Sequence, residues 1–342
     1  NFPRYAEFDP AVPVWCVTPD IDGCYHRFFD TSPISPSGRY LGVTRMRRED
    51  IVPQPGDPCD IVVVDLQEGT TQIIAESRGW DTQLGAQVQW GADDTQLFFN
   101  DMNCVTWRPF GVVMDPVTGA RRELDGTVYM VSRDGQRAAS PCLRRMSRTQ
   151  AGYGVLVPEE QIPSNHGAPS DDGLFVTDVS TGACDLLCSI DDIVKAVLDP
   201  SAYERGDFYG FHVKWNPVGD RLMFVLRWVG QEGEKPRNPN AITMRADGSE
   251  IAVCFSDVDW SRGGHHPDWA PDGVTGTINM KLTDDQLSLV RADADGSNLA
   301  AMTTVPGSGH PSLHPNGQQI VTDVYLHESL AYGDGTTPIR WI

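Results

Sequence analysis

Histidine is the residue type whose positions in this sequence most strongly suggest chemistry. Three similar phrases are each preceded by histidine: His212 precedes VKW, His265 and His266 precede PDW, and His310 precedes PSL. Neutral imidazoles gathered in one place bind divalent cations and leave a coordination position open for a substrate. The spacing therefore predicts a centre built from His212, His310 and one of His265 or His266, with ring nitrogens about 2.0–2.2 Å from a common point.

The metal ion that this histidine set favours is Mn, Zn or another divalent cation, Ca included. His166, in a long segment between repeats, is a candidate further ligand. The alternative is that each histidine caps a turn or hydrogen-bonds to the backbone. That turn role is the one expected for His314, which lies in the turn HPNG.

A second group of residues suits a substrate that carries a carboxylate. The sequence CYHR, with His26 and Arg27, precedes the first repeat, and Arg144, Arg145 and Arg148 crowd one segment of an otherwise acidic chain. Guanidinium groups bind carboxylates through two parallel hydrogen bonds. Removal of a proton next to a carboxylate requires that its charge be neutralised and that a base and an acid stand nearby. The candidate residues for this chemistry are catalytic Tyr129, Arg145 and His26, and substrate-binding Arg27, Arg148 and Tyr153. The alternative reading places Tyr129 in a strand core and the arginines in surface ion pairs.

A repeat shows which elements position these residues. A strand, a turn rich in Pro, Asp, Asn and Gly, and a second strand recur six times, as in SPISPSGRYLGVTR and PSLHPNGQQIVTD. A second motif, such as IVVVDLQEGTTQII, supplies two more strands to most copies. Four antiparallel strands per unit, repeated at this spacing, are typical of an all-β propeller. Equivalent positions of successive blades then lie at equivalent places, so histidines from different blades can converge.

The number of predicted strands does not correspond to a whole number of four-stranded blades. Six repeats are visible, and residues 12–17 form an extra strand before the first, of the kind that completes the last blade and removes a sheet edge. Residues 338–342 resemble the third strand of the sixth unit. We therefore expect a single propeller domain over residues 1–342, seven-bladed with its C-terminal part missing from this sequence, or alternatively six-bladed. An insertion over residues 144–169 and a helix over residues 189–198 are expected between the third and fourth repeats.

The composition of the chain excludes some classes of binding partner. A net charge of −20 argues against nucleic acid, which needs a basic surface, and no run of 18 apolar residues suggests a membrane span. An acidic oligosaccharide can still bind a locally basic pocket, and the oligomeric state is not predicted. The eight cysteines form no CxxC motif and are too sparse for a disulfide scaffold. The sequence shows no signal peptide, which favours the cytoplasm slightly over secretion or the periplasm.

The turn phrases SPSG, APDG and HPNG resemble those of TolB-like and oligogalacturonate-lyase-like propellers. GAQVQWGADDTQLFFND and SGHPSLHPNGQQIVTD extend the resemblance, which covers nearly the whole chain. It implies a polysaccharide lyase that acts on uronic-acid sugars. In that family a divalent ion is held by His and Gln ligands from late blades, and Tyr and Arg come from consecutive blade strands, with a spacing similar to that of Tyr129 and Arg145. The paired His-containing segment of the ulvan lyases is not evident here.

The leading functional hypothesis is therefore metal-assisted β-elimination on a uronic-acid-containing oligosaccharide or polysaccharide. A non-catalytic TolB-like propeller that binds a protein or peptide is the second hypothesis. A hydrolase or isomerase that uses the same His and metal site is the third. Convergence of the histidines discriminates between them, because a pure binding module has no reason to gather them.

Overall fold

The computed structural model describes residues 2–7, 10–231, 238–282 and 285–342. Within these ranges the chain divides into two compact units. The first unit contains residues 1–164 and 175–185, and the second contains residues 165–174 and 186–342.

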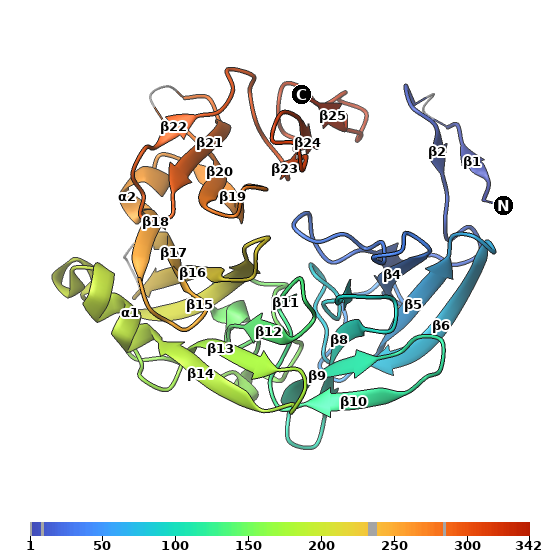
Figure 1. Cartoon of the computed structure of the whole chain (residues 1–342), viewed down its shortest axis with the longest axis horizontal. Coiled ribbons are helices and arrows are strands. Elements are labelled where there is room, and N and C mark those ends of the chain that lie inside the picture. Colours follow the sequence, from blue (N-terminus) through green and yellow to red (C-terminus); the bar gives the residue numbers. More distant parts are fainter. Residues whose placement is uncertain (1, 8–9, 232–237, 283–284) are drawn as a thin grey trace. The chain divides into compact units, whose positions relative to one another are not determined.

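Three four-stranded antiparallel sheets follow one another from the first repeat to residue 189, and in each the strands are neighbours in chain order (Figure 1). The strands of blade 1 are β3 (Cys24–Tyr25), β4 (Tyr40–Arg45), β5 (Cys59–Asp65) and β6 (Thr70–Ser77). Those of blade 2 are β7 (Gln89–Trp90), β8 (Leu97–Asn103), β9 (Arg108–Met114) and β10 (Arg121–Leu124). Those of blade 3 are β11 (Met130–Val131), β12 (Arg137–Ser140), β13 (Gly173–Asp178) and β14 (Cys184–Ser189).

Three further sheets belong to the second unit. The strands of blade 4 are β15 (Gly206–Trp215), β16 (Arg221–Gly230), β17 (Asn238–Arg245) and β18 (Ala252–Phe255). Those of blade 5 are β19 (Gly264–Trp269), β20 (Thr275–Met280), β21 (Ser288–Asp293) and β22 (Ala300–Ala301). Blade 6 has three strands in the described ranges: β23 (Ser312–Leu313), β24 (Ile320–Thr322) and β25 (Arg340–Trp341).

The all-β propeller predicted from the repeat is thus confirmed, with six blades in the described ranges, and β25 is the strand expected at residues 338–342. A seventh blade is not among the described residues, so the seven-bladed count stays a prediction. The strand expected at residues 12–17 differs from the prediction. It is β2 (Val14–Trp15), which pairs with β1 (Arg4–Tyr5) in a two-stranded sheet instead of completing the last blade. The chain supplied a nearer antiparallel partner for its backbone hydrogen bonds.

The blades of the first unit are apolar on both faces, and this explains the continuous apolar strand sequences. Ile61 and Val63 on β5 pack with Leu97 and Phe99 of β8. The intervening Val62 and Val64 pack on the other face, against Phe2, Val17 and Ile21 of the N-terminal segment. Because side chains alternate along a strand, a run such as IVVV serves both faces at once.

The helix expected over residues 189–198 lies between blades 3 and 4 as predicted, whereas the insertion over residues 144–169, expected between blades, lies inside blade 3. Helix α1 (Ile190–Val197) follows β14, and the Ser189 hydroxyl accepts a hydrogen bond from the Asp192 amide at 3.0 Å as the N-terminal cap. The predicted insertion separates β12 from β13 and holds two 3₁₀ helices, η1 (Met146–Arg148) and η2 (Glu159–Gln161). A third, η3 (Pro200–Tyr203), precedes β15, and helix α2 (Asp257–Trp260) follows β18. In the described ranges, no helix is long and apolar enough to cross a membrane.

Candidate functional site

Three of the predicted histidines meet in the second unit. The rings of His265 and His266, on β19, lie 4.5 Å apart between centroids, and the rings of His266 and His310 lie 4.1 Å apart. His310 stands just before β23, so the group joins blades 5 and 6. Two strands from neighbouring blades therefore build what we call the histidine cluster: His265, His266 and His310.

Local backbone geometry places His266 in this cluster. The register of β19 against β20 shifts between His265 and Asp268, and His266 has a φ of +61°. The register of β15 against β16 shifts at the equivalent point, between Gly210 and Val213, so His212 also lies in a bulge. Bulges of this kind redirect a side chain out of the regular alternation of a strand. His266, which stands three residues before Trp269 as His212 stands before Trp215, is the structural equivalent of His212 and His310.

Hydrogen bonds hold two of the three rings through the same nitrogen. His266 Nδ1 lies 2.6 Å from the Gly309 carbonyl oxygen, and His310 Nδ1 lies 2.9 Å from Asp323 Oδ2. A carbonyl oxygen and a carboxylate oxygen can only accept, so each Nδ1 carries the proton. Burial opposes ionisation of the Asp323 carboxyl, but its hydrogen bonds from the His310 side chain and amide outweigh this and lower its pKa. In each of these two rings Nε2 is then the nitrogen that faces away from the oxygen acceptor.

The cluster is neutral near pH 7 at two of its members. Burial lowers the pKa of His265 to about 4 and that of His266 to about 2, and the neighbouring imidazoles add to both shifts. Desolvation disfavours the charged form of a base. The two rings are thus kept in the unprotonated state that binds metals and accepts protons.

Aromatic and basic groups border the cluster. The Tyr325 ring lies 5.4 Å from that of His265 and 6.0 Å from that of His310, and it stacks on His327. Lys214, whose side chain is only 1% exposed, has its Nζ 3.6 Å from Asp268 Oδ1. Its charge is a minor cause of the low pKa of His266, after burial and the two other histidines, which places Lys214 within electrostatic range of the cluster.

The other two predicted ligands lie elsewhere on the second unit's elements. His212 is buried in β15, where its ring packs edge-on against Phe211. His166 is exposed, in a segment whose neighbours Asn165 and Gly167 are hydrogen-bonded to β15 residues. Their membership of a shared coordination sphere stays a prediction. His314 does have the turn role expected of it, since its Nδ1 accepts a hydrogen bond from the Asn316 amide.

Arg27 and Tyr129 come together in the first unit. The Arg27 guanidinium stacks over the Tyr129 ring at 4.7 Å and donates to Gln87 Oε1 at 2.6 Å and to Asp30 Oδ1 at 2.5 Å. Arg27 is 3% exposed and Tyr129 is fully buried, and burial raises the pKa of the Tyr129 hydroxyl well above its usual value. Arg27 thus makes a buried ion pair with Asp30 and a cation–π contact with the neutral Tyr129 ring.

The remaining candidates of the first unit occupy its loops. Arg148 donates to Glu159 Oε1 at 2.5 Å and to the Ile162 carbonyl at 2.8 Å, which ties η1 to η2 within the insertion. Arg145 precedes η1 and is half-buried, as is Tyr153, whereas His26 is exposed. The catalytic and substrate-binding roles given to these residues stay predictions.

A metal ion fits the histidine cluster in the chemistry of its donors. His266 and His310 each turn Nδ1 toward an oxygen acceptor, and Nε2 is the other imidazole nitrogen, of the kind that binds Mn, Zn and Fe. Across the residues that the structure describes, no three His, Cys, Asp or Glu side chains are arranged to hold a metal ion as they stand. The donor set is therefore present, and a closed coordination sphere is not.

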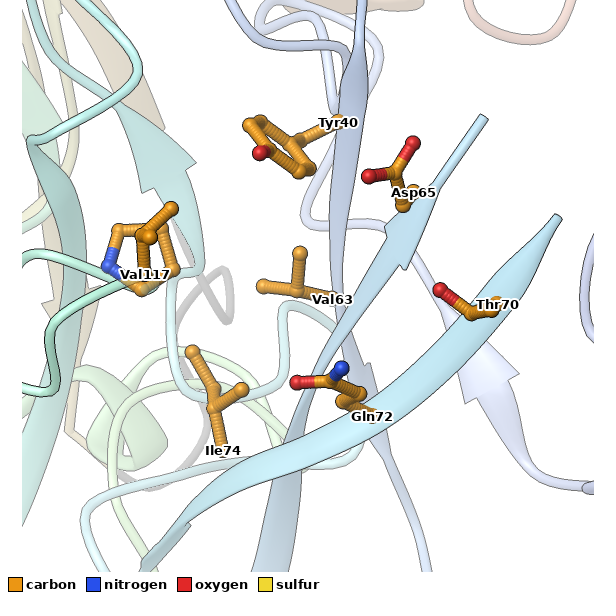
Figure 2. A pocket seen from close by; sticks show the side chains of 8 residues that line it. Tyr40, Val63, Asp65, Thr70, Gln72, Ile74 and Val117 are labelled. Atoms are coloured by element: carbon orange, nitrogen blue, oxygen red, sulfur yellow. The ribbon is translucent and has the colours of Figure 1, made fainter. Parts of the chain in front are cut away.

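A separate cavity of about 190 Å³ lies in the first unit, lined by residues of β4, β5 and β6 and by Pro116 and Val117 (Figure 2). Its carboxylate, Asp65, already accepts hydrogen bonds from Arg39 through Oδ2 and from the amides of Gln67 and Glu68 through Oδ1. No predicted site residue lines it. With its acid saturated, this cavity offers no evident catalytic group.

Asp323, Tyr325 and Lys214 were missed by the sequence reasoning. The register Ser312↔Val321 of β23 and β24, continued outward from the HPNG turn, places His310 opposite Asp323. Counting cross-strand positions from that turn would have found the pair. Alignment of VKW with PDW would likewise have set Lys214 beside Asp268.

Known structures share this fold. No protein-family model matches the chain, and no curated protein sequence matches it. An oligogalacturonate lyase in complex with manganese superposes with a TM-score of 0.63 at 15% identity, over 99% of this chain and 83% of that chain. The oligogalacturonate lyase of Vibrio parahaemolyticus gives 0.58 at 15% identity, over 94% of this chain and 77% of the other. The chain therefore shares the β-propeller fold of these oligogalacturonate lyases.

That likeness confirms, at the level of the fold, the resemblance predicted from the turn phrases. The tricorn protease also superposes, with a TM-score of 0.51 at 12% identity, over 94% of this chain and 30% of that chain. Propellers of this kind therefore occur in proteins of different activity, and the activity has to be argued from the site.

Proposed function

We propose that this protein is a lyase that cleaves a uronic-acid-containing oligosaccharide by β-elimination at the histidine cluster, with a divalent cation. The observation that carries the proposal is the meeting of His265, His266 and His310, from two blades, with ring centroids 4.1–4.5 Å apart. Two of these rings are oriented through Nδ1 by the Gly309 carbonyl and by Asp323, and imidazoles oriented in this way are common ligands of divalent cations.

The reaction makes three demands on the residues. The C–H bond next to the carboxylate breaks, its electron pair forms a carbon–carbon double bond, and the glycosidic oxygen leaves with a proton. A base must take the first proton, an acid must supply the second, and positive charge must face the carboxylate. Lys214 supplies charge near the cluster. The neutral histidines and Tyr325 are the groups able to exchange protons.

The cation would be held by Nε2 of His266 and of His310. When bound, it would neutralise the substrate carboxylate and so acidify the neighbouring C–H. Manganese is the ion present in one of the similar oligogalacturonate lyases, and Mn, Zn and Ca are the ions to test. Arg27, Arg145, Arg148, Tyr129, Tyr153 and His26 are proposed as a further substrate-binding and catalytic set of the first unit. Each is tested by its own substitution.

The decisive experiment is an assay for unsaturated uronate. Metal-loaded protein is incubated with oligogalacturonate, ulvan and glucuronan oligomers, and the ultraviolet absorbance of the new double bond is followed. We expect product from one of them, and we expect His310→Ala to abolish both product and tight metal binding while its thermal transition stays within a few degrees of wild type.

His314→Ala is the matched control, because it removes a histidine four residues away that serves the HPNG turn. It should retain activity. Absence of product from all three sugars with every metal would reject the lyase function and favour the binding-module hypothesis. An active His310→Ala variant would instead reject the histidine cluster as the site of the reaction.

A further inference from the structure

A cavity of about 420 Å³ lies in the second unit, formed by loops of blades 5 and 6. Its walls are the segments that follow β20, precede β23 and follow β24. Pockets that bind small molecules typically enclose roughly 300–1,000 Å³. None of the described residues that line the cavity belongs to the histidine cluster or to the other predicted site residues, so it is a separate feature of this unit.

One lining residue, Ser308, carries a hydroxyl group that lacks a hydrogen-bond partner. Ser308 is 3% exposed, and within the described part of the chain its Oγ forms no hydrogen bond. Its carbonyl, in contrast, accepts a hydrogen bond from the Thr322 hydroxyl, which holds the backbone at this position. A buried polar group without a partner costs free energy, so a hydroxyl group in this state beside a cavity indicates a polar molecule inside it.

The lining side chains combine hydrogen-bond donors, acceptors and apolar surface. The Lys281 ammonium donates, the Glu328 carboxylate accepts, and the Ser308 hydroxyl can do both. Leu287 and Leu330 add the apolar surface. A sugar ring presents hydroxyl groups that donate and accept, together with an apolar face of C–H groups. The cavity thus offers the mixture of contacts that a sugar ring can use.

The charges at the cavity favour a neutral sugar over a uronate. Lys281 Nζ lies 3.8 Å from Asp285 Oδ1, so its positive charge is already partly balanced. Glu328 adds a second carboxylate, and the two acids outnumber the single base among the described lining residues. A uronate would bring another negative charge to this wall, whereas the hydroxyl groups of a neutral sugar meet no such repulsion.

The cavity adjoins the histidine cluster through one short segment. Ser308 is two residues from His310, and two residues of chain span at most about 7 Å. The Gly309 carbonyl between them accepts hydrogen bonds from His266 Nδ1 and, at 3.1 Å, from Asn279 Nδ2. The wall of the cavity and the cluster are therefore parts of one hydrogen-bonded arrangement.

We infer that this cavity binds a neutral sugar unit, with Ser308 and Glu328 bonded to its hydroxyl groups and Leu330 against its apolar face. The inference rests on the proposed function only in assigning that unit to the same chain as the uronate. The substrate class is then a mixed polysaccharide of uronates and neutral sugars, and not a polymer of uronates alone.

Binding can be measured without metal and without activity. Saturation-transfer NMR is recorded with the methyl glycosides of galactose, xylose and rhamnose, and with that of galacturonate, which carries a carboxylate where galactose has a hydroxymethyl group. We expect transfer to at least one neutral glycoside, equal in wild type and in His310→Ala because His310 does not line the cavity. In His310→Ala the galacturonate glycoside should bind about tenfold or more weakly than that neutral glycoside.

Substitutions locate the site. Ser308→Ala and Leu330→Ala should each weaken binding of the neutral glycoside about threefold or more. Leu326→Ala is the matched control, since it removes an exposed leucine four residues from Leu330 that is not among the lining residues. Glu328→Gln keeps an acceptor and removes the charge, so it should narrow the preference for the neutral glycoside over the galacturonate one.

Failure of this inference and failure of the lyase function give different results. Protein that binds none of the neutral glycosides, or whose binding is unchanged in Ser308→Ala and Leu330→Ala, has no sugar site in this cavity, whatever it cleaves. Protein that binds a neutral glycoside in the cavity and cleaves none of the uronate polymers keeps the sugar site and loses the lyase function.

Discussion

The carboxylate of Asp323 fixes which face of His310 is available. It accepts hydrogen bonds from both the backbone amide and Nδ1 of that residue, so the ring is held with Nε2 turned away from Asp323. In Asp323→Asn an amide replaces one of these oxygens and its N–H competes for Nδ1. We expect Mn²⁺ affinity to fall roughly 10–100-fold, as for other residues that orient a ligating histidine. Calorimetric titration measures it, and Asp334→Asn, an exposed turn residue, is the control for lost charge.

Gly309 is a second residue that the site requires. It has a φ of +68°, and a Cβ there would clash with the Asp323 carboxylate. Gly317 has nearly the same φ, +70°, with nothing near its Cβ position. Gly317→Ala should therefore cost about 1 kcal/mol of unfolding free energy, for the left-handed backbone alone. Gly309→Ala should cost roughly 2–4 kcal/mol, because Asp323 must also move. Equal losses in denaturant titrations would show that the close approach carries no strain.

The hairpins are the elements that the sequence predicts best. Each turn motif predicted the two strands on either side of it, because Pro, Asp and Gly at fixed offsets allow few other conformations. They did not predict the bulge that separates His265 from His266, since a bulge adds a residue without any turn signal. The sequence therefore left open which of the adjacent pair His265 and His266 faces His310, and the roles of these residues stay predictions. Its supporting groups, Asp323 and Lys214, were missed because cross-strand and cross-blade positions were not counted.

The turn at Asp81 ties the insertion to blade 2 of the first unit. Its carboxyl accepts hydrogen bonds from the amides of Gln83, Leu84 and Gly154, the last at 2.8 Å. Burial raises the pKa of Asp81 to about 7, against partial opposition from these amides, whereas an unfolded aspartate has its ordinary value of 3.8. Between these two values the folded state binds more protons than the unfolded state. Unfolding free energy should therefore fall as pH rises from about 4 to 7, by up to about 1.4 kcal/mol per pH unit from this group.

The measurement is the difference in unfolding free energy between wild type and Asp81→Asn at pH 6 to 8, by urea titration. The variant should be less stable by about 1–3 kcal/mol at pH 6, because the Gly154 amide loses its acceptor. The difference should shrink as pH rises toward 8. Exposed Asp171→Asn should show no such trend. A difference that stays constant from pH 6 to 8 would mean that Asp81 is ionised throughout this range.

For the whole molecule, the sequence repeat specifies the blades, and the apolar clusters buried between successive blades stabilise them. Alternating side chains bury both faces of blades 1 and 2 against their neighbours, so the large apolar clusters of the first unit are shared between successive blades. This could be predicted from the apolar runs. The pairing of β2 with β1 could not be predicted, because a strand of two residues is too short for its sequence to indicate which strand it pairs with.

Because each compact unit has its own buried contacts, we expect the chain to unfold in two calorimetric transitions. Gly309→Ala acts in the second unit and Asp81→Asn in the first. Each should lower one transition and leave the other in place, by roughly 2–4 °C per kcal/mol lost for a unit of this size. The double variant should show both shifts, since the effects of substitutions in separate cores that share no partners add. A single transition that both substitutions lower would mean that the blades unfold as one cooperative array.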